Sequence, residues 1–384
     1  MQNKRFERHT LRTVFARAAG GSAGGGGFAW KATIAMAGVL FIGGCPKPQT
    51  EMPPPPKERS RVSIVRERPG DVRVDGVGPI RGFANGRDCT FMHCLELVLD
   101  AVGRKIGYDE LMGISGMAFR IQFRTDRWDV GNPDPLVGES CLEALFSGVG
   151  WDYETKIVKR DDYAEVDSLY RTVAKSIDSG MPVLAANIIA PEDWGIIVGY
   201  RGARTWLCRS YNGGAETTDK PATGWPTATV FLTNRKVRPD PRKVHLDSLR
   251  RGADLFERKG TGPAALGARA LEAWRDNLRS PKDRTYIHAN FWSYVNLIDA
   301  RGAAVRYLRS IAKEFGAKEM YVGMAAEYFD GETRLLLEGL KNVPSEEKFP
   351  NSMPPAEMRS RQSETLKQAQ TLEEKAADAL RKCL

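Results

Sequence analysis

Two cysteines and a histidine stand close together in the stretch Asp88-Cys89-Thr90-Phe91-Met92-His93-Cys94. The first turn of a helix is the positive end of its dipole, which lowers the pKa of a thiol placed there and favours the thiolate. Cys89 has that position if Asp88 caps the helix, although the Asp88 carboxylate opposes part of the effect. Cys89 is therefore the first candidate for a nucleophile.

Two neighbours of Cys89 are further candidates. Cys94 lies on an apolar face that helical spacing predicts to be buried, because Phe91, Leu95 and Val98 share that face. We therefore expect a core thiol at Cys94. His93 lies one turn after Cys89, where it is either a catalytic base on the same helix or a histidine at the surface or in a supporting position.

Two asparagines could complete such a site. Asn85 precedes Cys89 and could donate to an oxyanion, and Asn212 follows a predicted strand and could orient a catalytic group. Each asparagine precedes glycine, so each is equally explained as part of a turn. The histidines and cysteines show no metal-ligand spacing and no nucleotide-binding glycine motif occurs, so we expect no metal and no cofactor.

Helix and strand patterns alternate from about residue 75 to residue 237. The leading helix begins at Cys89 and ends at Gly103, and a second amphipathic helix ends at Gly180. Short runs rich in valine and isoleucine follow the second helix, at 182–189, 194–200, 205–209 and 228–232. These patterns predict an α+β domain at 75–237, with the leading helix packed on a mostly antiparallel sheet.

Only helical patterns occur from about residue 243 onward, in a helical domain at 243–340 and a linker with a C-terminal helix at 341–384. The expected helices are 243–258, 263–279, 285–314, 317–340 and 356–383. The last helix carries an apolar stripe that needs a partner helix, formed by Leu366, Ala369, Leu372, Ala376, Leu380 and Cys383. We expect the arginines of this half on solvated faces and in ion pairs, namely Arg275, Arg279, Arg301, Arg306 and Arg309.

The N-terminus resembles a bacterial lipoprotein signal. Residues 1–44 combine a basic lead, a glycine-rich spacer and an apolar run that ends at Ile42-Gly43-Gly44-Cys45. Small residues before a cysteine let a signal peptidase approach, and the Cys45 thiol would accept the lipid. An uncleaved anchor and a buried helix are the alternatives. A proline-rich tether follows at 45–74, with loosely ordered residues from 57 onward, so we expect a protein anchored to a bilayer through Cys45 in the cell envelope.

The order of motifs resembles papain-like domains of two related bacterial groups. The helix-borne cysteine is followed by LMGISGMAFR at 111–120, by a turn at 177–183 and by a strand at 194–200. One group is the bacteriocin-leader-processing cysteine peptidases. The other is the N-terminal domain of butirosin biosynthesis protein H, an acyltransferase that moves an acyl group from a carrier protein to an aminoglycoside. The resemblance covers roughly residues 75–340, including helical segments that follow the domain in bacterial relatives.

The resemblance implies a helix cysteine as nucleophile and a strand histidine as base. Cys89 matches the nucleophile by its position, and Cys94 competes because the butirosin-type pattern contains a His-Cys pair. The strand that should begin with histidine instead carries Asp193, whose carboxylate is a poor base near neutral pH. The other histidines are His9 in the signal and His245 and His288 in the helical half.

Composition narrows the function classes. The chain has 384 residues, 42% of them hydrophobic, and no apolar run as long as a membrane-spanning helix, so a polytopic membrane protein is excluded. Most of the net charge of +9 comes from residues 1–44, which hold six lysines and arginines against one glutamate. We therefore expect no nucleic acid partner.

The cysteines behind Cys45 number five, an odd count that leaves at least one thiol free unless a bridge forms between chains. A Cys94–Cys141 or a Cys89–Cys208 bridge would remove a candidate nucleophile. The sequence does not assign the pairs.

Three functions remain open. The favoured one is a papain-like domain that lacks the standard Cys-His pair and binds an unknown peptide or small molecule. The second is a cysteine-dependent hydrolase or acyltransferase that uses Cys89 or Cys94. The third is a scaffold lipoprotein whose helical half contacts a partner.

Overall fold

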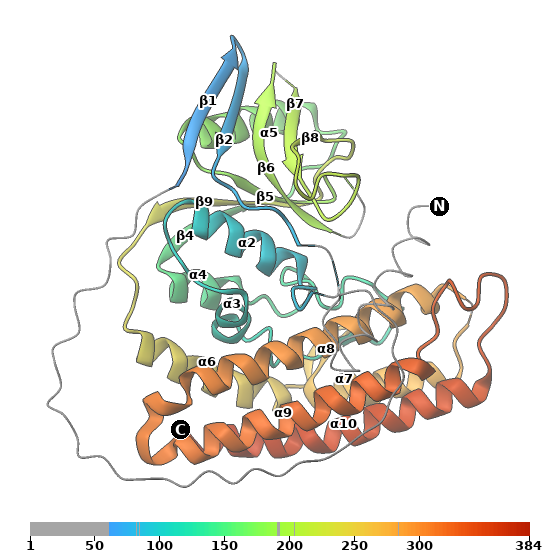
Figure 1. The fold of residues 1–384 in the computed structure, drawn as a ribbon. Helices are drawn as coiled ribbons and strands as arrows, with labels where there is room; N and C mark the ends of the chain where they lie inside the picture. The colour runs from blue at the N-terminus through green and yellow to red at the C-terminus, as the bar shows by residue number, and fades with distance from the viewer. Residues whose placement is uncertain (1–60, 82, 84, 190–192, 203, 283) are drawn as a thin grey trace, which may run out of the picture.

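The computed structural model describes residues 61–81, 83, 85–189, 193–202, 204–282 and 284–384 (Figure 1). An antiparallel sheet with helices forms the first half and helices form the C-terminal region, which confirms an α+β fold followed by a helical region. The predicted signal peptide, Cys45 and the tether up to residue 60 lie outside the described residues. Within the described part, no helix is both long and apolar enough to cross a membrane.

The large sheet curls around strand β6 (Trp194–Arg201). Residues 194–197 of β6 pair with β5, and residues 199–201 pair with β2 along the same edge, while β7 runs along the opposite edge. The other seven strands of this sheet are β1 (Ser63–Arg68), β2 (Asp71–Asp75), β4 (Trp151–Lys156), β5 (Val183–Ala186), β7 (Thr205–Arg209), β8 (Lys220–Pro221) and β9 (Thr229–Arg235). The prediction that 182–189 and 194–200 contain adjacent strands is confirmed.

The two faces of the sheet are covered by different helices. On one face, Phe91, Leu95 and Val98 of α2 (Thr90–Ala101) pack in one apolar cluster with Leu184 and Ile196. On the other face, α5 (Tyr163–Asp178) packs with the alternate residues of the same strands, such as Val183 and Ile197. Successive side chains of a strand point to opposite faces of the sheet. Strands that are apolar on both faces therefore need a helix packed on each face.

The loosely ordered stretch predicted at 57–74 is wrong for its C-terminal part. β1 and β2 form an antiparallel hairpin, and β2 joins the edge of β6. Val72 and Val74 are the buried residues of β2, between partly exposed charged ones. Two apolar residues among many charges give a weak sequence signal for a strand. The backbone pairing of β2 with β6, which the sequence does not reveal, stabilises the strand.

A second, three-stranded sheet joins the two halves of the chain. It consists of β3 (Gln122–Arg124), β10 (Gly260–Thr261) and β11 (Ala264–Leu266), so the prediction of helices alone after residue 243 is wrong. The helix expected at 263–279 begins only at Gly267, because the residues before it pair with β3. Gly267 has a φ of 55°, and a Cβ there would lie 2.0 Å from the carbonyl oxygen of Phe256.

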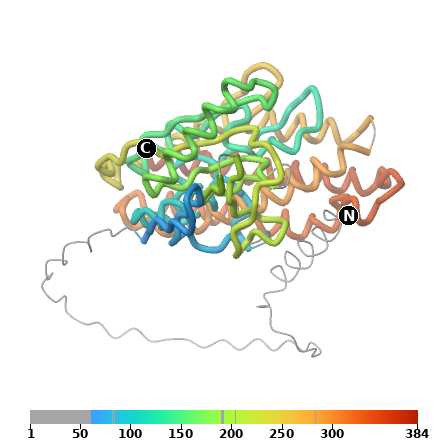
Figure 2. Tube along the Cα trace, turned by 90° about the horizontal axis from the view of Figure 1, so that it is seen from above, coloured from blue at the N-terminus to red at the C-terminus, as the bar shows by residue number. Residues whose placement is uncertain are grey.

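Long helices build the C-terminal region close to the predicted positions. They are α6 (Pro241–Glu257), α7 (Gly267–Arg279), α8 (Tyr286–Ile311), α9 (Glu319–Gly339) and α10 (Ala356–Lys382). The 3₁₀ segments 312–318 and 340–342 flank α9. Figure 2 shows the sheet half lying over these helices, whose orange and red end extends beyond it. Two shorter helices, α3 (Tyr108–Ser115) and α4 (Leu142–Val149), lie between α2 and the helical region.

The stripe on α10 is covered by the chain itself. Leu366, Ala369, Ala376 and Leu380 are buried, and α10 packs against α6, α7 and α9. The partner helix that this stripe was expected to need is therefore supplied within the same molecule.

Arg301 forms ion pairs, as expected, but it does not lie on a solvated face. It is fully buried on α8, lies 3.3 Å from the Glu332 carboxylate, hydrogen-bonds Glu373 and donates to the carbonyl oxygen of Ala118 at 2.7 Å. A buried charge is tolerated only when paired in this way. The pairing ties α8, α9 and α10 to the segment before β3, a long-range role that local spacing does not reveal.

Candidate functional site

Cys89 is itself the N-cap residue of α2, and the prediction that Asp88 caps this helix is wrong. The backbone N–H of Cys89 donates to the Tyr108 hydroxyl at 3.0 Å, and that hydroxyl donates to the Asp299 carboxylate. The backbone N–H of Asp88 donates to the same carboxylate at 3.1 Å. Asp299 comes from α8, so the helical region holds the start of α2 in place.

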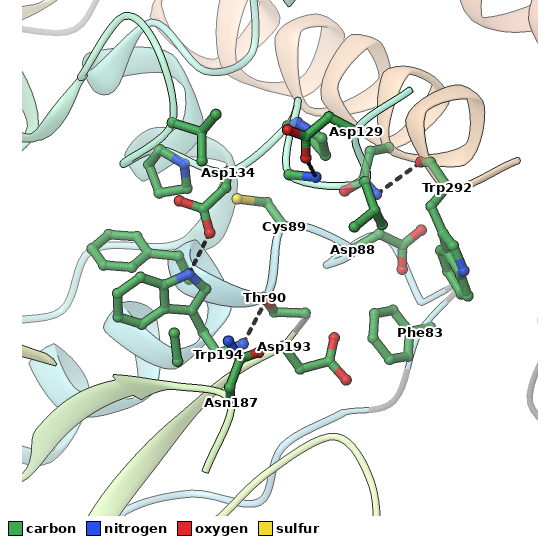
Figure 3. Close-up of a pocket in the computed structure, with 18 of the residues that line it drawn as sticks. Phe83, Asp88, Cys89, Thr90, Asp129, Asp134, Asn187, Asp193, Trp194 and Trp292 are labelled. Atoms are coloured by element: carbon green, nitrogen blue, oxygen red, sulfur yellow. Dashed lines mark hydrogen bonds between the residues drawn. The ribbon is translucent and has the colours of Figure 1, made fainter. Parts of the chain in front are cut away.

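The thiol of Cys89 is buried, with 7% of the residue exposed. Burial raises its pKa strongly, and nearby Cys141, Asp134 and Asp299 raise it further, which outweighs the lowering by a backbone hydrogen bond from Met92. Figure 3 shows the sulfur directed toward Asp134. The thiol is therefore protonated at neutral pH, opposite to what the helix position alone predicts.

Cys94 lies in the core, where its place on the apolar face puts it. Its sulfur donates to the carbonyl oxygen of Trp194 at 3.5 Å, and burial raises its pKa well above the ordinary value. The five described cysteines carry free thiols, so neither the Cys94–Cys141 nor the Cys89–Cys208 bridge is formed.

His93 is held away from Cys89 by two other partners. Its Nε2 accepts a hydrogen bond from the backbone N–H of Arg81 at 3.0 Å, and its Nδ1 lies 2.9 Å from the Glu96 carboxylate. Nε2 therefore carries no proton and Nδ1 donates to Glu96. Both ring nitrogens serve the structure around α2, and neither is directed at a thiol.

The other two described histidines come from the helical region. His245 on α6 lies between Glu314, at 2.6 Å, and Glu110, at 4.0 Å. His288 lines the same cavity as Cys89 but stands 11 residues before Asp299, which marks the level of Cys89 on α8. At 1.5 Å per residue, His288 lies about 16 Å from Asp299 along the helix axis. Helical side chains lean toward the N-terminus, which directs the His288 imidazole further from the level of Cys89.

Asp193 and Asn212 meet at the edge of this cavity. The Asn212 amide donates to the Asp193 carboxylate at 2.6 Å, and both residues line the cavity together with Cys89. Asn85 donates to the carbonyl oxygen of Phe83 at 3.4 Å, as in a turn. The structure thus brings together Cys89, Asp193 and Asn212, while His93 and Cys94 point elsewhere.

The cavity has a volume of about 370 Å³ and lies between the two halves of the chain (Figure 3). Its walls are the start of α2, the ends of β5 and β6, the loop 125–141 and α8. Aromatic and acidic side chains dominate the lining, among them Phe83, Phe91, Trp194, Trp292, Asp88, Asp129, Asp134 and Asp193. The sequence patterns did not predict the walls formed by the loop and by α8.

Arg120 shapes the loop wall. Its guanidinium donates to four backbone carbonyl oxygens, those of Asn132, Asp134, Val137 and Glu139, at 2.6–3.4 Å. Gln122 adds hydrogen bonds to the same loop. A sequence signal for this wall exists in Gly131-Asn132-Pro133-Asp134-Pro135, because two prolines stiffen the chain around an acidic residue.

A smaller cavity of about 40 Å³ adjoins the large one and shares Cys89, Pro133 and Asn296 with it. Two polar atoms of its lining residues, Nδ2 of Asn132 and Oγ of Ser293, are buried and have no hydrogen-bond partner among the described residues. Leaving such a group unpaired costs about 1–3 kcal/mol. The volume and these two groups suit a small polar occupant.

Neither a metal-ligand group in the described part of the chain nor a known relative indicates what the site binds. Among the described residues, no group of three or more His, Cys, Asp or Glu side chains is placed to hold a metal ion. No protein-family model matches the chain, and no curated protein matches it significantly.

Proposed function

We propose that the chain is a bacterial lipoprotein, anchored through Cys45 on the periplasmic or exterior side of a membrane, whose papain-like domain binds a peptide or small molecule. The anchor rests on the Ile42-Gly43-Gly44-Cys45 pattern. The papain-like assignment rests on a cysteine at the start of a helix that packs on an antiparallel sheet, beside a cavity.

One observation carries the binding role. Cys89 opens onto a cavity large enough for a small ligand, yet its thiol is protonated and no histidine hydrogen-bonds it among the described residues. Papain-type catalysis needs an imidazole within hydrogen-bond reach of the sulfur. The cavity therefore offers space for a ligand, whereas the imidazole that papain-type proton transfer would need does not hydrogen-bond the sulfur in the described part of the chain.

A cysteine-dependent hydrolase or acyltransferase is the alternative. The position of Cys89 at the N-terminus of α2 and on the cavity wall favours it. This activity would need ligand binding to bring an imidazole to the sulfur or to lower the pKa of the thiol by several units.

Labelling of Cys89 with iodoacetamide between about pH 5 and pH 9 separates the two functions, with the modified residue mapped by mass spectrometry. We expect labelling only above about pH 8, or none, because the reactive thiolate is rare below that pH. Fast labelling at pH 5–6 that is lost on replacing His288 or His93 would establish the enzyme instead.

Blocking the cavity tests the binding role directly. Val130→Trp places a large side chain in the cavity lining, and Ile157→Trp makes the same change at a residue that is 74% exposed. We expect the first variant, and not the second, to lose the binding of short peptides or small molecules detected by NMR. Equal binding by both variants would contradict the role of the cavity.

Cys45→Ala tests the anchor. We expect the variant to lose lipid attachment and to move from the detergent phase to the aqueous phase. Unchanged processing and unchanged detergent partition would refute the anchor and leave the binding role untouched.

A further inference from the structure

The large cavity is electrostatically one-sided. Asp88, Asp129, Asp134 and Asp193 line it, whereas the described lining contains no lysine or arginine and His288 is its one histidine. Arg127, at 3.0 Å, already neutralises Asp129. The carboxylate of Asp129 is therefore paired within the protein.

Asp134 is the carboxylate with the best-defined environment. Its two oxygens accept hydrogen bonds from two uncharged donors, the backbone N–H of Leu136 and the Nε1–H of Trp194, both at 2.7 Å. Burial raises the pKa of Asp134 overall, although the hydrogen bonds from Trp194 and Leu136 and the charge of Arg120 lower it in part. A positive charge entering the cavity would compensate this carboxylate.

The smaller cavity supplies an independent indication of a ligand. Asn132 and Ser293 line it and are 2% and 7% exposed, and each has a buried polar atom that no group in the described part of the chain hydrogen-bonds. The Asn132 amide nitrogen can only donate, so it calls for an oxygen acceptor. The Ser293 hydroxyl can donate to the same oxygen.

The two indications lie close together along the chain. Asn132 and Asp134 flank Pro133, which lines both cavities. Two residues span at most about 7 Å, so the Cα atoms of Asn132 and Asp134 lie within that distance of each other. Phe83 and Trp292, with ring centroids 5.4 Å apart, add an aromatic wall that suits a cation and its aliphatic chain.

We propose that the two adjoining cavities together take one ligand. Its protonated primary amine lies beside Asp134 in the large cavity, and its carbonyl oxygen is held by Asn132 and Ser293 in the smaller one. This inference rests on the proposed binding role and adds the chemical class of the ligand. A lysine-like fragment, with an amine on a short aliphatic chain and an amide carbonyl, has both groups.

The test compares matched probes on the full chain in detergent by isothermal titration. Nα-acetyl-lysinamide has both groups, Nα-acetyl-norleucinamide lacks the charge, and 1,5-diaminopentane lacks the carbonyl. We expect the lysine probe to bind at least about tenfold more tightly than the norleucine probe, with affinity falling as salt rises.

Two variants locate the groups. Asp134→Asn should lower the affinity for both amines about tenfold and remove the preference for lysine over norleucine. Asp126→Asn, in the same loop but outside the cavity lining, is the charge-matched control. Ser293→Ala should weaken both amide probes several-fold and leave 1,5-diaminopentane unchanged, with Ser310→Ala, at an exposed serine of the same helix, as its control.

Each outcome decides the inference. Equal binding of the lysine and norleucine probes, or an unchanged affinity in Asp134→Asn, overturns the amine preference and leaves a binding cavity in place. Binding of no probe overturns the ligand class, and Cys89 labelling then decides the binding role separately. If Asp134→Asn does not fold, the lysine-to-norleucine ratio and its salt dependence decide alone. An unchanged amide affinity in Ser293→Ala means that the small cavity holds only water, and the carbonyl part fails.

Discussion

Glu96 on α2 and Asp134 in the loop 125–141 are both partly buried carboxylates, and their hydrogen-bond donors differ in charge. Glu96 accepts hydrogen bonds from Arg87 at 2.9 Å, from His93 at 2.9 Å and from the backbone N–H of Tyr108 at 3.1 Å. Burial alone would raise its pKa, but the bonds from His93 and Arg87 prevail and lower it to about 2.

Asp134 has no cation of this kind hydrogen-bonded to its carboxylate among the described residues. Its donors are uncharged, and burial raises its pKa. A carboxylate neutralised inside the protein fixes structure, as Glu96 does by linking α2 to the start of α3. The uncharged donors of Asp134 compensate its charge less, and its raised pKa reflects the cost of burying the charged form.

Removing the charge of Glu96 should give the largest effect on stability. Glu96→Gln keeps the shape but loses the charged partner of Arg87 and His93, so we expect a loss of about 2–3 kcal/mol in the free energy of unfolding. Urea denaturation measures it. Glu154→Gln, at an exposed ion pair with Lys156, is the control and should change stability by less than about 1 kcal/mol. A loss no larger than in the control would contradict the structural role of Glu96.

Acid should weaken the same contact. The pKa of Glu96 is lowered in the folded state from 4.5 to about 2, so its contribution is fully present above pH 4.5 and is lost as the pH falls through about 2. This contribution is on the order of 3 kcal/mol, at 1.36 kcal/mol per pKa unit. We expect the stability of the wild type to fall more steeply between pH 5 and pH 2 than that of Glu96→Gln. Parallel pH profiles would show that Glu96 is not the titrating group.

Removing the charge of Asp134 should give the smallest effect on stability. Asp134→Asn loses one acceptor for Leu136 or Trp194, but it also removes a buried charge, so we expect a net change of about 1 kcal/mol or less. Thermal denaturation at pH 7 measures it. A loss as large as that of Glu96→Gln would make Asp134 a structural residue and end the contrast between the two carboxylates.

Local sequence patterns predicted the helices and strands in which the spacing of apolar residues indicates the buried face. The spacing of Phe91, Leu95 and Val98 specified α2, and the apolar runs at 182–189 and 194–200 specified β5 and β6. The long C-terminal helices followed from the same periodicity. These patterns are local because a helix or strand repeats its buried face every few residues.

The candidate site was predicted only in part. Cys89, Asp193 and Asn212 were named from the sequence and line one cavity. The state of the Cys89 thiol was not predictable, because helix position suggests a lowered pKa whereas burial beside Asp134 raises it. The roles of His93 and Arg301 were not predicted either. The partner of His93 is the loop residue Arg81, and the partners of Arg301 lie on the helices α9 and α10.

The sequence by itself determined α2, the strands β5 and β6, the long C-terminal helices and which residues could do chemistry. Only the tertiary structure decided that α8 and the loop 125–141 close the cavity, that Asp299 holds the start of α2, and that β11 joins β3. The physical reason is range. A residue's propensity and periodicity act over one or two turns, whereas charge compensation and burial depend on groups that the fold brings together from up to 211 residues away.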